Sequence, residues 1–189
     1  LDGSTILWNY QEERDLAVLF EDAESDRTGF SADGRFFAGY TAQMETWAGI
    51  WDGTTGRLLR RIEDGQSAVC DLAFAPSGSR LAVVGRDGAV SLHDAADSGL
   101  VRLVSLGSET ARRANREQCL CWSADGSLLA TSGHDRTIRL WSGCDGRPVT
   151  ELECTVRPNL IVFSPDGRNI FAGDTNGVVL HYPLDGIDA

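Results

Sequence analysis

The side chains best suited to catalysis or metal binding are few and scattered. Three histidines occur, His93, His134 and His181, and none has the His-Glu-x-x-His or His-x-His spacing that brings two ligands to one metal ion. The chain has no lysine to complete a phosphate-binding P-loop and no Gly-x-Ser-x-Gly nucleophile motif. We therefore expect no catalytic residue, no metal and no cofactor, and we expect the histidines to be structural.

The cysteine pattern also excludes a zinc ribbon and a disulfide framework. There are five cysteines, an odd number, and no Cys-x-x-Cys pair. Cys119 and Cys121 stand two residues apart, so on a strand they face the same way. They could start a soft-metal site, but packed free thiols are the simpler interpretation. Reduced thiols favour an intracellular protein, cytoplasmic or nuclear.

Acidic residues outnumber basic ones, and the formal net charge is -11. Such a surface repels nucleic acid and anionic lipid, so we expect neither a direct nucleic-acid partner nor a membrane. One loop departs from this balance, because Arg112, Arg113 and Arg116 lie together in ARRANRE. Arginine forks bind carboxylates and phosphates, which makes these residues candidates for binding a partner. A solvated surface insertion is the alternative.

A second candidate partner site lies in TAQMETWAGIW (41–51). This segment adds Met44 and Trp47 to a turn, and tryptophan at a protruding turn is a common interface anchor. Packing of Trp47 against neighbouring structure is the alternative.

The elements that carry these residues recur along the chain. Four phrases combine an aromatic residue with a turn that ends in glycine: FSADG (30–34), FAPSG (74–78), WSADG (122–126) and FSPDG (163–167). Their glycines are separated by 44, 48 and 41 residues. Asp-Gly and Ser-Gly between apolar runs predict hairpin turns, because glycine takes a positive φ at no steric cost.

A short apolar run, a second turn, an alternating strand and a fourth strand follow each phrase. In the third copy these are LLATSG (128–133), HDR (134–136), TIRLWS (137–142) and PVTELE (148–153). Counted from glycine to the end of the third strand, the first copy has four extra residues in its second turn. The repeating unit is therefore predicted to be four short antiparallel strands. Repeats of this length must stack on one another to bury both sheet faces.

The period, the SPDG turn and the TIRLW phrase resemble the WD-repeat family, which implies an all-β fold of β-propeller blades. The resemblance implies a hydrogen-bonded set of Asp, Ser or Thr, Trp and His in each blade. The third copy supplies Ser132, Asp135 and Trp141 but lacks the histidine. Other copies supply parts of the set: Asp2 and Trp8, Trp51, Asp87 with His93 in place of tryptophan, and His181 in the same place.

The repeats divide the chain into five parts. We expect three full blades at 25–65, 66–107 and 108–155, with partial blades at 1–24 and 156–189. Because the chain opens within a repeat phrase, we expect an open segment of a larger ring, with possible self-association through bare blade edges.

The function implied by the resemblance is a protein–protein interaction scaffold that recruits protein or peptide partners through propeller loops. Two alternatives stay open: a component of an RNA-processing or other nucleic-acid-associated assembly, and an accessory sensor module of a larger multidomain protein.

Overall fold

The computed structural model describes residues 4–20, 27–40, 47–63, 68–97, 100–104, 119–133 and 135–187, which consist of strands and turns with no helix among them. The strands are β1 (Thr5–Asn9), β2 (Arg14–Phe20), β3 (Arg27–Phe30), β4 (Phe36–Tyr40), β5 (Ala48–Asp52), β6 (Leu58–Ile62), β7 (Val69–Phe74), β8 (Arg80–Gly85), β9 (Val90–Asp94), β10 (Leu100–Val104), β11 (Leu120–Trp122), β12 (Leu128–Ser132), β13 (Thr137–Ser142), β14 (Pro148–Glu153), β15 (Leu160–Phe163), β16 (Asn169–Gly173) and β17 (Val179–Pro183).

These strands form antiparallel sheets in which each strand pairs with the next along the chain. Three sheets have four strands: the first sheet (β3–β6), the second sheet (β7–β10) and the third sheet (β11–β14). A first hairpin (β1–β2) precedes them, and a last sheet of three strands (β15–β17) follows. The all-β architecture of four-stranded blades predicted from the repeats is confirmed.

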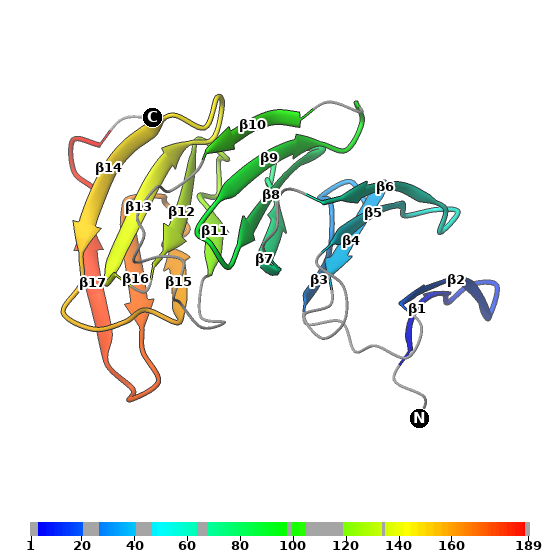
Figure 1. Cartoon of the computed structure of the whole chain (residues 1–189), viewed down its shortest axis with the longest axis horizontal. Helices are drawn as coiled ribbons and strands as arrows, with labels where there is room; N and C mark the ends of the chain where they lie inside the picture. The colour runs from blue at the N-terminus through cyan, green and yellow to red at the C-terminus, as the bar shows by residue number, and fades with distance from the viewer. Residues whose placement is uncertain are drawn as a thin grey trace.

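The sheets stack side by side in an open arc, with the first hairpin at one end and β17 at the other (Figure 1). The first strands of consecutive sheets contact one another, β3 with β7, β7 with β11 and β11 with β15. These first strands therefore form the inner side of the arc.

The core lies between sheets, because successive residues of a strand point to opposite faces. On β8, Leu81 and Val83 pack toward the first sheet, whereas Ala82 and Val84 pack toward the third. Two further apolar clusters lie between the first hairpin and the first sheet and between the third and last sheets. Each fully buried aliphatic side chain stabilises the stack by about 1.5–3 kcal/mol.

The Ser-x-Asp-Gly phrases form one repeated turn. The Ser123 hydroxyl donates to Asp125 at 2.6 Å and accepts the backbone N–H of Leu128 at 2.9 Å. The turns at Ser31 and Ser164 make the same bonds. Gly34, Gly126 and Gly167 close these turns with φ of 70°, 73° and 70°, the conformation that favours glycine.

Strand register corrects two details of the predicted alignment. Tyr182 lies opposite Ile170, as Trp141 lies opposite Leu129, so Tyr182 and not His181 occupies the tryptophan position of the last sheet. The strand ends Tyr40 and Ala48 pair eight positions apart, whereas the equivalent residues in the other sheets pair six apart. The first copy therefore has two extra residues and not four. The glycine of each apolar run is not a fixed reference point, because it falls at different register positions.

Candidate functional site

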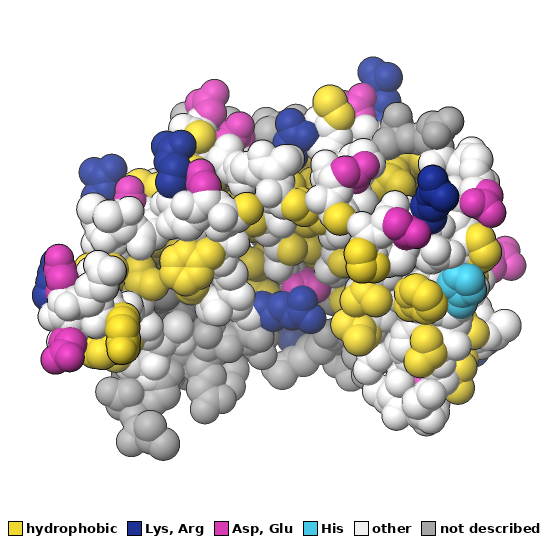
Figure 2. All heavy atoms as spheres, turned by 180° about the vertical axis from the view of Figure 1, so that it is seen from behind, with side chains coloured by type: hydrophobic (Ala, Val, Ile, Leu, Met, Phe, Trp, Pro, Cys, Tyr) yellow, Lys and Arg dark blue, Asp and Glu magenta, His cyan; other side chains and the backbone are white. Residues whose placement is uncertain are grey.

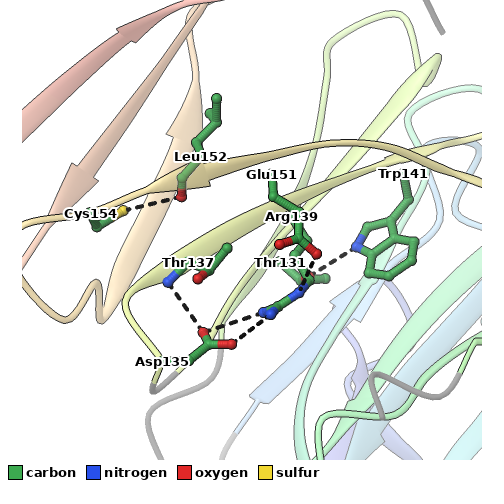
Figure 3. Close-up of polar contacts among 8 residues, drawn as sticks. All are labelled: Thr131, Asp135, Thr137, Arg139, Trp141, Glu151, Leu152 and Cys154. Carbon is green, nitrogen blue, oxygen red and sulfur yellow. Dashed lines mark hydrogen bonds and ion pairs between the residues drawn. The ribbon is translucent and has the colours of Figure 1, made fainter. Parts of the chain in front are cut away.

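A set of polar contacts of the third sheet includes Trp141, Thr131, Asp135 and Arg139 (Figure 3). The buried indole Nε1 of Trp141 donates to the Thr131 hydroxyl at 3.0 Å. Ser132, the partner expected from sequence, instead accepts the backbone N–H of Cys119 at 3.1 Å. The tryptophan partner is therefore the residue one position earlier, because Thr131 and Trp141 share one face of the sheet.

Asp135 of the third copy pairs with an arginine of β13. Asp135 accepts two hydrogen bonds from Arg139, the shorter one at 2.5 Å from Nη2, and accepts the backbone N–H of Thr137 at 3.2 Å. Glu151 of β14 lies on the other side of the guanidinium, 3.2 Å from Arg139 Nε (Figure 3). Asp135 thus holds the turn between β12 and β13 by bonding both the Arg139 side chain and the Thr137 backbone.

The other repeats carry parts of this arrangement. Trp51 is buried, and its ring centroid lies 5.9 Å from that of Phe37. Asp87 accepts the backbone N–H of Ala89 in the turn between β8 and β9. His93 is buried at the tryptophan position, and its Nε2 lies 2.8 Å from the Ser91 hydroxyl. Asp2 lies outside the described residues, and Trp8 is half exposed on the first hairpin.

Side chains also connect neighbouring sheets to backbone carbonyl groups. Trp122 Nε1 of the third sheet donates to Ala73 O of the second at 3.0 Å. The Tyr182 hydroxyl of the last sheet donates to Glu153 O of the third at 3.1 Å. Arg60 of the first sheet donates to Asp94 O of the second at 3.3 Å. Directed bonds of this kind fix how each sheet is oriented on its neighbour.

Of the candidate partner-binding residues, the structure describes only Trp47. Its side chain is 7% exposed and packs with Leu7 and Trp51 in the cluster below the first hairpin. The Arg61 guanidinium lies over its ring, 4.1 Å from the centroid. Trp47 is therefore packed against neighbouring structure and is not an exposed interface anchor. Met44, Arg112, Arg113 and Arg116 lie outside the described residues.

Cys119 and Cys121 are packed thiols, whereas Cys144 is exposed. Cys119 and Cys121 both lie in the cluster between the third and last sheets. Burial raises the pKa of Cys119 to about 11 and that of Cys121 to about 12, which keeps both thiols protonated at neutral pH. Within the described residues, no group of three or more His, Cys, Asp or Glu side chains is placed to hold a metal ion.

The outward face of the last sheet is apolar and uncovered within the described chain. Val90, Ile138 and Val179 occupy one register position in three sheets, and their exposed fractions are 2%, 0% and 67%. Figure 2 shows apolar side chains gathered beside a histidine at this end of the molecule.

The same face differs in composition from the faces between sheets. Phe171 stands at the position of the small, fully buried residues Ala82 and Ala130. Its ring stacks on His181 with centroids 4.9 Å apart, and His181 Nε2 lies 2.7 Å from Asn169 Oδ1. A sheet packed here would meet the Phe171 ring and the polar His181 and Asn169 side chains as well as the aliphatic Val179.

The other end of the arc is also partly apolar. On the first hairpin Ile6, Trp8 and Val18 are each about half exposed, and the Tyr10 side chain is 82% exposed. The Trp8 and Tyr10 rings meet edge to face with centroids 6.2 Å apart. Two apolar surfaces, on the first hairpin and on the last sheet, therefore flank the three complete sheets.

Stacked four-stranded antiparallel sheets with first strands on the inner side are the architecture of β-propeller blades. Residues 56–94 and 118–142 match the family model described as WD domain, G-beta repeat. These two segments of the chain therefore resemble WD repeats.

Several curated proteins resemble it. Autophagy-related protein 16 of Arabidopsis thaliana is 27% identical over 74% of this chain and 27% of its own length. WD repeat and SOCS box-containing protein 1 of Xenopus tropicalis is 36% identical over 49% of this chain and 21% of its own length. The U3 small nucleolar RNA-associated protein 15 homolog of Xenopus laevis is 26% identical over 94% of this chain and 33% of its own length. The chain thus spans a third or less of each relative. Among the described residues, no helix has the length and apolar character needed to cross a membrane.

Proposed function

We propose that this chain is part of a non-catalytic scaffold that recruits protein or peptide partners through its propeller loops. The observation that carries the proposal is the stack of sheets joined by directed side-chain bonds, such as Trp122 to Ala73 and Tyr182 to Glu153. A stack held in this way presents its loops in a fixed arrangement, which is what simultaneous recruitment requires.

We propose the loop that contains Arg112, Arg113 and Arg116 as the first contact surface. Three arginines in a chain of net charge -11 form a local basic site for carboxylates or phosphates of a partner. Met44 is proposed as a further contact. Trp47 is not included, because its side chain is buried against the first hairpin. The free thiols favour the cytoplasm or the nucleus as the location.

Affinity capture with the full-length protein tests this function. The wild type is compared with a variant in which Arg112, Arg113 and Arg116 are changed to glutamate. We expect the wild type to retain at least one protein that binds directly after purification, and we expect the variant to lose it.

A matched control changes three exposed arginines elsewhere, Arg14, Arg57 and Arg147, to glutamate. This control alters net charge by the same amount and should retain the partner. If both variants lost the partner equally, the loss would follow from net charge, which would contradict specific binding by the loop that contains Arg112, Arg113 and Arg116. Failure of any captured protein to bind directly would contradict the scaffold function.

A second candidate, membership in a nucleic-acid-associated assembly, is favoured by one observation. The U3 small nucleolar RNA-associated protein 15 homolog aligns with 94% of this chain. The net charge opposes direct contact with RNA. Direct RNA binding would show an affinity that falls as the salt concentration rises. The slope of log affinity against log salt concentration would become shallower when Arg112, Arg113 and Arg116 are changed to alanine.

A further inference from the structure

A buried carboxylate lies at the junction of three sheets. Asp71 lies on β7 and is 1% exposed. Its Oδ2 accepts the backbone N–H of Leu120 on β11 at 2.9 Å. Its Oδ1 accepts the backbone N–H of Leu72 at 2.8 Å and lies 3.2 Å from Arg27 Nη1 of β3. One side chain thus contacts the inner strands of the first, second and third sheets.

The backbone of β7 accounts for this placement. The pairing of β7 with β8 shifts register between Val69 and Asp71, which marks a β-bulge. A bulge bends the strand and redirects a side chain that would otherwise follow strict alternation. The result places a charged group in a strand, VCDLAF, whose other residues are apolar or small.

A buried charge is unfavourable unless donors surround it. Asp71 has two backbone donors and one guanidinium, which offset part of that cost. Two neutral bonds stand next to it: the Tyr40 hydroxyl donates to Cys70 O, and Trp122 donates to Ala73 O. These neutral bonds join the same sheets whatever the charge of Asp71.

The groups that face Asp71 determine how it titrates. Burial raises the pKa of Asp71 above the usual 3.8, although the Leu120 N–H, Arg27 and the Leu72 N–H favour the ionised form. Cys70 on the same strand, Cys119 next to β11 and Cys121 on β11 are protonated, with pKa values of about 11, 11 and 12. Arg86 and Asp87 act on Cys70. Arg27 is therefore the one described charge that pairs with Asp71.

We propose that Asp71 is a pH-sensitive connector that holds the first sheet to the second through Arg27 while it bonds the third sheet through Leu120. When Asp71 is ionised, both links are present. Protonation removes the charge that holds the Arg27 guanidinium and leaves the neutral Tyr40 and Trp122 bonds in place. The Arg27 link between the first and second sheets is thus present at neutral pH and is lost in mild acid, while protonation also removes the cost of burying the Asp71 charge.

Urea unfolding of the whole chain between pH 4.5 and 8 tests the connector with Arg27→Gln, Asp71→Asn and the double variant. We expect Arg27→Gln to lower the urea midpoint most at neutral pH, where Asp71 is ionised, and less as the pH falls. In the Asp71→Asn background, Arg27→Gln should leave the midpoint unchanged at every pH. Arg147→Gln, which breaks an exposed pair with Asp145 at 2.9 Å, is the matched control and should show no such pH dependence. A loss that is equal in both backgrounds would overturn the proposal.

A measurement on the unmodified chain avoids dependence on folded variants. We expect the carboxyl carbon resonance of Asp71 to titrate above pH 3.8 and the Leu120 amide resonance to shift with the same midpoint. Titration of Asp71 at or below 3.8, or a Leu120 amide that does not follow it, would overturn the connector.

Discussion

The indole of Trp141 and the hydroxyl of Thr131 form a buried hydrogen bond of 3.0 Å between β13 and β12. Both residues are nearly inaccessible, and the Trp141 ring packs against the second sheet. The bond therefore orients the Trp141 ring against the second sheet.

Replacing Thr131 with valine should lower the free energy of unfolding by about 1–3 kcal/mol, because the buried indole donor loses its acceptor. In a Trp141→Phe background, the same change should cost little, since no donor remains. A double-mutant cycle by denaturant unfolding measures the difference. Equal costs in both backgrounds would mean that the hydrogen bond does not stabilise the sheet.

Gly143 follows β13 in a position that admits no side chain. A Cβ there would lie 2.1 Å from Gly126 O and 2.9 Å from the Trp122 ring. Gly143→Ala should destabilise the chain by about 1–3 kcal/mol through overpacking. Gly29→Ala is the control, because no atom lies within 4 Å of a Cβ at Gly29. Thermal melts in which Gly143→Ala unfolds no earlier than Gly29→Ala would contradict the packing at this turn.

The repeated turns predict how stability falls in acid. Hydrogen bonds from Ser31, Ser123 and Ser164 lower the pKa of Asp33, Asp125 and Asp166 below the usual 3.8. Because the unfolded chain then binds more protons, the stability from these groups is present above 3.8 and is lost as the pH falls through the folded values. Urea midpoints should drop below pH 3.8. A variant with alanine at the three serines should show a weaker drop, and an unchanged drop would exclude the turn carboxylates as its cause.

Val90 and Val179 allow a paired test of the uncovered face. Val179→Lys should change the free energy of unfolding by no more than about 0.5 kcal/mol, because its side chain is exposed. Val90→Lys places a charge at the same register position under the third sheet and should prevent cooperative folding. Circular dichroism melts compare the two. Similar melting temperatures would show that the second and third sheets are not packed together.

The repeat pattern predicted the turns and most strands, because Asp-Gly and Ser-Gly chemistry is local. It placed Ser132 beside Trp141 and His181 at the tryptophan position, each one residue from the correct site, because register depends on pairing across strands. Asp71 carries no local signal beyond a charge in an apolar strand, since its partners lie on two other sheets. The blade boundaries at 24/25, 65/66, 107/108 and 155/156 stay a prediction.

The scaffold function is tested most directly by calorimetric titration of this chain with a purified protein captured by the full-length protein. A parallel titration uses single-stranded RNA at about 150 mM salt, where electrostatic binding is screened. We expect saturable binding of the protein and no binding of RNA. Saturable binding of RNA, with no binding of the protein, would contradict the scaffold function.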